Sequence, residues 1–239
     1  MKIAICYSGQ PRQFKEGFVN QIKTFDLAKS NVEDTIDTFC HFWYDHSLDG
    51  QYYWDKFPER GKFDKNIKDW IYEEVKPIKC EFETPRIWNF QGLVPDLKIP
   101  HPLVNVFSML YSIEKSIELK SQYEKDNDFK YDLVIRLRSD LCFGNSIESF
   151  HKFTDDKVHI LNEKSHTSYA INDQFAIGSS ELMNLYSHTF TNIFDLVNRG
   201  SVVNPECLVG FNLHFNGIEI VKHNWEYCLF RDFRGAKHI

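Results

Sequence analysis

The sequence predicts a single α/β domain with a Rossmann-like, mostly parallel central sheet flanked by helices. Residues 3–7 form a short, nearly continuous apolar run, which is typical of a strand buried on both faces of a parallel sheet. A polar break at residues 8–11 and a segment of helical periodicity from 14 to 28 follow, as in the first half of a βαβ unit. The 239 residues contain no internal repeat, low-complexity tract or linker, so residues 1–239 are expected to form one domain.

Two segments show the clearest helical pattern. In residues 14–28, apolar side chains recur on one side at Phe18, Ile22 and Phe25. Residues 103–125 follow Pro102, which suits a first helical turn. Their apolar side is Leu103, Val106, Phe107, Leu110, Ile113 and Ile117, and a polar stripe on another side is Asn105, Ser108, Ser112 and Ser116. Further helices are expected at 65–74, 179–190 and 204–217, the second capped by Ser179 or Ser180.

Short apolar or alternating runs predict the remaining strands. These are expected at 36–46, 76–83, 131–143, 156–161 and 173–179, with a final extended segment at 218–231. Residues 84–102 contain four prolines and little periodicity, and are therefore expected to form an irregular loop.

The strand expected at 131–143 carries charges where a buried strand should be apolar. Because side chains alternate between faces, Leu133, Ile135 and Leu137 share one face. Val134, Arg136 and Arg138 share the other, and the arginines lie just before Ser139 and Asp140. Two cations on one face need either partners or an anionic ligand, so a structural ion-pair network is the alternative to a binding site.

Composition excludes some classes of protein. The net charge of −6 and the pI of about 5.9 argue against a general nucleic-acid binder, while leaving room for a local basic pocket. Aromatic residues make up 15% of the chain; they are common in carbohydrate sites, but filling the core is their usual role. Six cysteines without a CxxC pair are expected to be buried free thiols. The N-terminal apolar run is too short for a signal peptide and no run is long enough to span a membrane, so a soluble, cytoplasmic protein is expected.

Two further polar patches follow predicted strands, where ligands bind in open α/β sheets. In the first, residues 8–12, Gly9 allows close approach of the backbone to a ligand and Arg12 suits a phosphate or a ring oxygen. A plain strand-to-helix turn explains the same residues. The second, Asn172, Asp173 and Gln174, precedes an apolar run; a turn or helix-cap aspartate is the alternative there.

Three stretches together resemble nucleotide-sugar-dependent glycosyltransferases of the GT-A fold. The stretches are IAICYSGQPRQF, YDLVIRLRSDL and NDQFAIGSSELMNLY, and the later PECLVGFNLHFNGIEI also fits. More closely, the chain is similar to small bacterial and viral glycosyltransferase-like proteins that begin with an IAxxxSGQxR strand. The resemblance covers most of the chain in the expected order, and implies a GT-A-like fold.

The resemblance implies a site for the donor diphosphate after the strand that contains Arg136. Enzymes of this family hold a divalent metal there with a DxD motif, and Arg138-Ser139-Asp140 occupies the position. The first carboxylate is missing, so either Asp140 alone binds Mn²⁺ or Mg²⁺, or Arg136 and Arg138 neutralise the diphosphate directly. Asp140 as a metal ligand is the expectation.

Other roles also come from the resemblance. Ser8, Gly9, Gln10, Arg12 and Gln174 are expected to contact the donor, together with the two arginines of the strand. Asp173 is the expected catalytic residue, as the base of an inverting enzyme or as a stabilising group in a retaining one. His223 is the expected second metal ligand and His238 a weaker candidate, with an ordinary surface histidine as the alternative. Arg231, Arg234 and Lys237 either cover the diphosphate or form a solvated tail.

The resemblance therefore predicts a glycosyltransferase that moves a sugar from a nucleotide donor, a UDP-sugar in preference to a GDP-sugar, to a hydroxyl of a glycan. The loops at 44–64 and 84–102 are expected to shape the acceptor side. The incomplete DxD leaves a non-catalytic sugar-nucleotide or glycan-binding protein as the alternative. A nucleotidyltransferase fits less well, because its first loop is usually richer in glycine and basic residues. No GxGxxG follows the first strand, which disfavours a dehydrogenase or methyltransferase.

Overall fold

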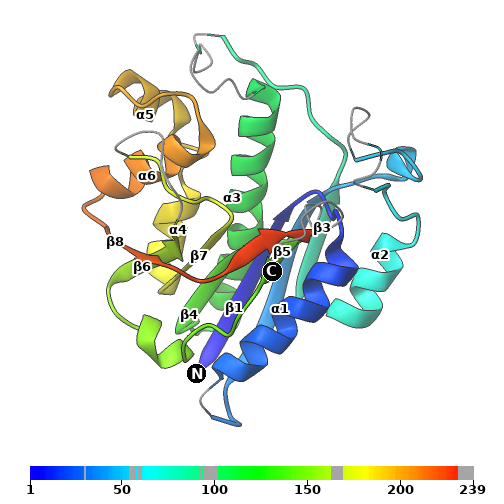
Figure 1. Ribbon diagram of the computed structural model, residues 1–239. Helices are drawn as coiled ribbons and strands as arrows, with labels where there is room; N and C mark the ends of the chain where they lie inside the picture. Colours follow the sequence, from blue (N-terminus) through cyan, green and yellow to red (C-terminus); the bar gives the residue numbers. More distant parts are fainter. Residues whose placement is uncertain are drawn as a thin grey trace.

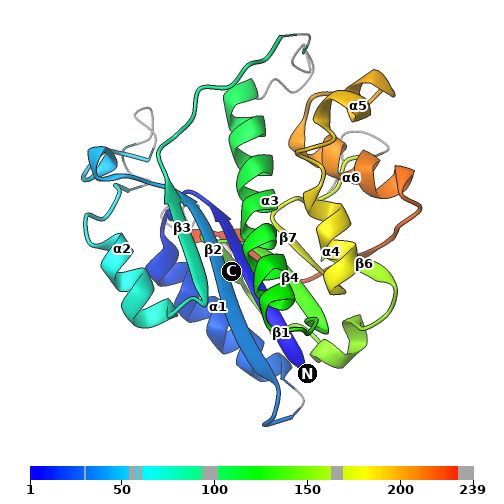
Figure 2. The ribbon, with the colours of Figure 1, turned by 180° about the vertical axis from the view of Figure 1, so that it is seen from behind.

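Seven strands form one central sheet in the computed structural model, which describes residues 1–29, 31–53, 58, 61–91, 93, 102–162 and 169–230. Their order is β3-β2-β1-β4-β7-β6-β8 (Figure 1, Figure 2). The strands are β1 (Lys2–Gly9), β2 (Thr35–Trp43), β3 (Lys79–Glu83), β4 (Leu133–Arg138), β6 (Lys157–Leu161), β7 (Phe175–Gly178) and β8 (Glu219–His223). Only β7 runs antiparallel to its neighbours, β4 and β6; the other pairs are parallel. The predicted α/β class with a mostly parallel sheet is confirmed.

Helices cover both faces of this sheet. On one face lie α1 (Phe14–Ala28) and α2 (Ile67–Trp70), which continues as a π-helical turn, Ile71–Val75 (Figure 1). On the other lie α3 (Leu103–Asp126), α4 (Ser180–Ser187) and α6 (Pro205–Phe215), with α5 (Ile193–Asn198) packed on α6. The helix predicted at residues 14–28 has the predicted bounds, and α3 extends one residue beyond the prediction. α5 was not predicted as a separate helix.

The alternation predicted for residues 133–138 places two cores on opposite faces of β4. Leu133, Ile135 and Leu137 belong to the core under α1, whereas Val134 belongs to the core under α3. Arg136 therefore points to the α3 face, the same face as Val134. The prediction that a charged residue, Arg136, lies within an otherwise buried strand is confirmed.

The strand predicted at 131–143 is in fact two strands, so that prediction was wrong. β4 ends at Arg138, and β5 (Leu141–Phe143) pairs with β9 (Tyr227–Leu229) in a separate two-stranded sheet. The buried side chain of Gln21 on α1 donates hydrogen bonds to the carbonyls of Arg138, at 3.1 Å, and of Leu141, at 2.6 Å. These bonds satisfy backbone groups that leave the main ladder, so the chain can turn there without buried, unpaired carbonyls.

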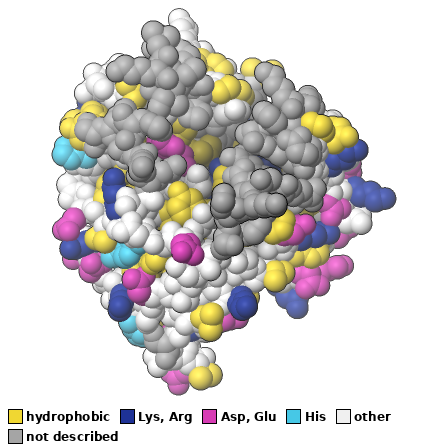
Figure 3. Space-filling model, in the orientation of Figure 1, with side chains coloured by type: hydrophobic (Ala, Val, Ile, Leu, Met, Phe, Trp, Pro, Cys, Tyr) yellow, Lys and Arg dark blue, Asp and Glu magenta, His cyan; other side chains and the backbone are white. Residues whose placement is uncertain are grey.

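The final extended segment predicted at 218–231 is likewise interrupted. β8 lies at the edge of the main sheet and β9 in the small sheet. None of the helices in the described residues has both the length and the apolar character that a membrane crossing needs. All six cysteines are free thiols, as predicted, although Cys80 and Cys228 are only half-buried. Figure 3 shows acidic and basic side chains intermixed over the described part of one face, without a broad basic field.

Candidate functional site

A cleft of about 500 Å³ opens at the carboxyl ends of β1 and β4. The chain runs from β1 outward through β2 and β3, then returns to β4 on the other side of β1. This reversal places α1 and α3 on opposite faces, and open α/β sheets bind ligands in the crevice that such a switch point leaves. The lining residues are Ser8, Gly9, Gln10, Arg12, Trp43, Tyr53, Pro85, Val104, Asn105, Ser108, Met109, Arg136, Arg138, Ser139 and Asp140. The structure thus brings together two of the three predicted patches.

The loop after β1 is held in place by hydrogen bonds from both walls of the cleft. The backbone N–H of Gly9 donates to the Ser112 hydroxyl of α3 at 2.7 Å. Ser139, between β4 and β5, donates to the carbonyl of Gln10 at 3.0 Å. Gly9 has a φ of 106°, which other residues rarely adopt, so this turn requires glycine. The loop therefore has one defined path across the carboxyl ends of both strands.

Arg136 is the most unusual residue of the cleft. Its side chain is only 1% exposed, yet its Nε and Nη1 atoms are buried without a hydrogen-bond acceptor. Burial lowers the pKa of this guanidinium, and electrostatic interactions with Tyr186 of α4 and with the carboxylates of Asp173 and Asp140 oppose the effect. Buried charged donors without acceptors are costly, so a partner that this structure lacks is indicated.

Further buried polar atoms without hydrogen-bond partners lie in the segments at the carboxyl ends of β1 and β4 and on α4. They are the hydroxyl oxygens of Ser8 and Tyr186 and the side-chain amide oxygens of Gln10 and Gln174. Ser8 lies opposite Arg138 in the β1–β4 ladder, two residues beyond the pair of Cys6 and Arg136. A concentration of unsatisfied donors and acceptors at one end of a sheet is typical of a ligand site.

Arg138 and Asp140 form a fork at the rim of the cleft. Arg138 Nε and Nη2 donate to the two carboxylate oxygens of Asp140, each at 2.9 Å. Asp140 is nearly buried, whereas about a quarter of the Arg138 side chain is exposed. Asp140 is also the only carboxylate among the described lining residues. A guanidinium already binds both oxygens of Asp140, and Arg12, Arg136 and Arg138 all line the cleft, so this set of residues favours an anion.

The third predicted patch lies beside Arg136 but does not line the cleft. Asp173 is 8% exposed and lies two residues before Phe175, the first residue of β7 that pairs with β4. The carbonyl of Gln174 accepts a hydrogen bond from the Arg138 N–H at 3.2 Å, and the Gln174 N–H donates to the Asn172 side chain at 2.9 Å. These bonds extend β7 along β4 and hold Asp173 near the buried guanidinium.

His223 is not brought to the cleft. It lies on β8, three strands from β4, which corresponds to about 14 Å. Its Nε2 is 2.9 Å from Nδ1 of His159, and its ring stacks on Trp225 at 4.3 Å. Burial and the neighbouring His159 both lower the pKa of His223. The geometry therefore gives no support to a metal shared by His223 and Asp140.

Several predicted residues have no described position. His238, Arg231, Arg234 and Lys237 lie outside the described residues, as do parts of the two loops that were expected to shape the acceptor side.

Sequence reasoning missed several residues of the cleft. Trp43, Tyr53 and Met109 line it, and Tyr186 contributes an unpaired hydroxyl beside Arg136. The polar stripe of α3 was visible in the sequence: Asn105 and Ser108 line the cleft, and Ser112 holds Gly9. Polar residues at helical spacing on an otherwise buried helix were the available signal.

No protein-family model matches the chain, and no curated protein matches it. Function is therefore inferred from the chemistry of the cleft itself.

Proposed function

We propose that the protein is a glycosyltransferase, which moves a sugar from a nucleoside-diphosphate donor to a hydroxyl of a glycan. One observation carries the proposal: the buried guanidinium of Arg136 faces a cleft at the switch point of the sheet with two nitrogen atoms unpaired. Phosphate oxygens are the natural acceptors for such a group, because guanidinium geometry matches them and charge strengthens each bond.

The other unpaired atoms favour a ligand with hydroxyl groups over a simple anion. Phosphate at neutral pH mainly accepts hydrogen bonds, and would satisfy Arg136 and the Ser8 hydroxyl. The amide oxygens of Gln10 and Gln174 need donors instead. Sugar hydroxyls and nucleobase N–H groups supply donors for Gln10, which lines the cleft, so a nucleotide sugar suits the unpaired donors and acceptors of the cleft better than a simple anion does. A UDP-sugar is the favoured donor on the resemblance of the sequence.

In this proposal the arginines carry the counter-charge of the leaving diphosphate. As the acceptor oxygen bonds to the anomeric carbon, the bond from that carbon to the diphosphate oxygen breaks. Arg136 and Arg138 then stabilise the charge that develops on the phosphate. The expected Mn²⁺ or Mg²⁺ at Asp140 stays a prediction, and such an ion would share the Asp140 carboxylate with Arg138. No step here depends on it.

Asp173 is the proposed catalytic residue. In an inverting reaction its carboxylate accepts the proton of the acceptor hydroxyl; in a retaining one it stabilises the positive charge on the sugar. The test is release of nucleotide from UDP-, GDP-, CMP- and dTDP-sugars, with and without a panel of glycans. Asp173→Asn should lower the turnover number by about 100-fold or more while donor affinity stays within about threefold. Full turnover by this variant would remove Asp173 from the mechanism.

One observation favours a non-catalytic sugar-nucleotide or glycan-binding protein as the second candidate. The single carboxylate among the described lining residues, Asp140, is bound by Arg138, so no free base lines the cleft. Tight binding of a nucleotide sugar, with no turnover with any acceptor, would favour this second function.

A further inference from the structure

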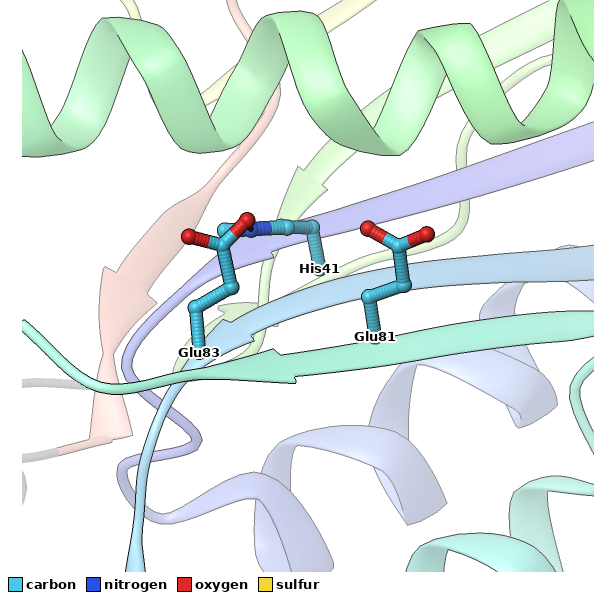
Figure 4. A group of neighbouring side chains, drawn as sticks. All are labelled: His41, Glu81 and Glu83. Carbon is cyan, nitrogen blue, oxygen red and sulfur yellow. Dashed lines mark ion pairs between the residues drawn. The ribbon is translucent and has the colours of Figure 1, made fainter.

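A second polar cluster lies outside the cleft, near the edge of the sheet formed by β3. His41 on β2 and Glu81 and Glu83 on β3 project toward the same side, the side of α3 (Figure 4). His41 and Glu81 are direct neighbours in the ladder, and Glu83 lies two residues further along β3. One ligand atom from each residue lies within 4.8 Å of the others.

The bonds of His41 leave one ring nitrogen without a hydrogen. The Ser112 hydroxyl donates its single hydrogen to the His41 carbonyl at 2.9 Å. It therefore accepts at its oxygen from the Gly9 N–H and from Nδ1–H of His41, at 2.7 and 2.9 Å. In the neutral ring Nε2 is then a bare acceptor. It is fully buried, makes no hydrogen bond and lies 3.3 Å from Oε1 of Glu83, so a lone pair faces a carboxylate oxygen.

A cation between Nε2 of His41 and Oε1 of Glu83 would remove the repulsion between their lone pairs. In a tetrahedral zinc site with bonds of about 2.0–2.1 Å, neighbouring ligand atoms are about 3.3–3.4 Å apart. The separation of Nε2 and Oε1 fits this spacing. Glu81 is exposed and makes no hydrogen bond or ion pair within the described part of the chain, so its carboxylate can swing in as the third ligand.

Most cations near the cluster are paired with carboxylates outside it, and Lys125 also lines the groove beside Glu81. Arg86 occupies Oε2 of Glu83, at 2.6 Å from Nη2, and the Tyr111 hydroxyl donates to Oε1 at 3.0 Å, which leaves one lone pair on that oxygen. Lys115 is paired with Glu118 at 2.5 Å. Two carboxylates thus face one guanidinium.

We infer that His41, Glu81 and Glu83 form a binding site for a divalent transition-metal ion, with Zn²⁺ as the best match and water as the fourth ligand. Mixed imidazole and carboxylate donors suit Zn²⁺ better than Mg²⁺ or Ca²⁺. The site is independent of the proposed transferase function. It is connected to the cleft through Ser112, which holds both His41 and Gly9, and through Trp43, which lines the cleft and whose ring contacts that of His41.

The test is titration of the metal-stripped full chain with Zn²⁺ by calorimetry, and with Co²⁺ by visible absorption. Wild type should bind one ion of each, with the Co²⁺ spectrum of a four-coordinate nitrogen and oxygen site. Glu81→Gln should weaken Zn²⁺ binding by about tenfold or more, and its exposed position makes folding of the variant secure.

Two control variants separate this site from others. Glu118→Gln removes a nearby exposed carboxylate outside the cluster, and Asp140→Asn removes the carboxylate of the cleft; both should keep Zn²⁺ affinity within about twofold of wild type. Absence of Zn²⁺ binding by wild type, or equal affinity in Glu81→Gln, would overturn the assignment. Loss of binding in Asp140→Asn with retention in Glu81→Gln would overturn it as well, by placing the ion in the cleft.

Discussion

Arg136 and Lys120 are two buried cations with opposite surroundings, and their replacement by methionine should have opposite effects on stability. Both are at most 1% exposed. The Lys120 ammonium has three partners, Glu124 at 3.1 Å, Ser180 at 2.6 Å and Asn184 at 2.9 Å. Arg136 has two nitrogens without any. If the function of Arg136 is to bind a ligand, replacement of Arg136 should make the unliganded protein more stable.

The magnitude follows from the unpaired donors. Each buried, unsatisfied donor costs about 1–3 kcal/mol, so the two in Arg136 cost roughly 2–6 kcal/mol. Lost attraction to Asp173 offsets part of this gain, since that carboxylate acts on Arg136. The net stabilisation expected for Arg136→Met is about 2 kcal/mol, or roughly 4–8 °C in Tm for a chain of this size. Lys120→Met should cost about 3–5 kcal/mol, because it removes the buried cation that balances the Glu124 carboxylate, which then keeps only the exposed ammonium of Lys130, at 3.6 Å, as a charged partner among the described residues.

Chemical denaturation and calorimetry of the unliganded variants measure both effects. A higher Tm for Arg136→Met together with a lower Tm for Lys120→Met supports a guanidinium reserved for a ligand. If Arg136→Met destabilises the protein as much as Lys120→Met does, Arg136 is a structural residue and the argument for the cleft fails.

Three further predictions test other parts of the structure. In Gly17→Ala, the new Cβ would lie 2.1 Å from the Ser139 carbonyl oxygen, so chemical denaturation should show a loss of about 1–3 kcal/mol in the free energy of unfolding. The control Val19→Ala, at an exposed position of α1, should change this free energy by no more than about 0.5 kcal/mol. Equal losses in the two variants would show that α1 does not need this close approach. Asp140→Asn should keep nucleotide affinity in EDTA within about threefold by calorimetry, whereas a large loss seen only when Mn²⁺ is present would restore the metal at Asp140. Burial lowers the pKa of His41, so the contribution of the neutral ring to stability is complete above the unfolded pKa of about 6.5 and is lost as pH falls through the folded pKa. In EDTA, the drop in Tm between pH 7.5 and pH 5.5 should therefore be smaller for His41→Gln than for wild type. An equal drop in the two proteins would contradict this prediction.

Local patterns in the sequence were sufficient for several elements of the fold. Alternation in residues 133–138 predicted which side chains share a face of the strand, because strand periodicity depends only on the backbone. The same reasoning predicted Arg136 on the face of Val134, and the structure shows that α3 covers this face. The polar loop after β1 and the residues after β4 were both predicted at the edge where ligands bind, and the cleft contains both.

Such local patterns could not predict contacts between segments that are distant in the sequence. The break between β4 and β5 depends on Gln21 of α1 and on the pairing of β5 with β9, nearly ninety residues further along the chain. The fork between Arg138 and Asp140 requires the turn that this break creates. Because the sequence does not reveal the bonds between Arg138 and Asp140, it predicted Asp140 as a metal ligand without them. The role of Ser112 was hidden for the same reason, since the register of α3 against β1 and β2 is decided by packing.

The central claim, that the cleft binds a nucleotide sugar through Arg136, is tested most directly by the melting temperature in the presence of nucleotides. Wild type and Arg136→Met should be compared with UDP-, GDP-, CMP- and dTDP-linked compounds, each with Mn²⁺ and with EDTA. A ligand at 100 times its Kd stabilises the native state by about 2.7 kcal/mol, or roughly 5–11 °C here. The account predicts such a rise for wild type with one class of nucleotide, in EDTA as well as in Mn²⁺, and none for Arg136→Met. No rise with any nucleotide, or an equal rise in both proteins, would contradict it.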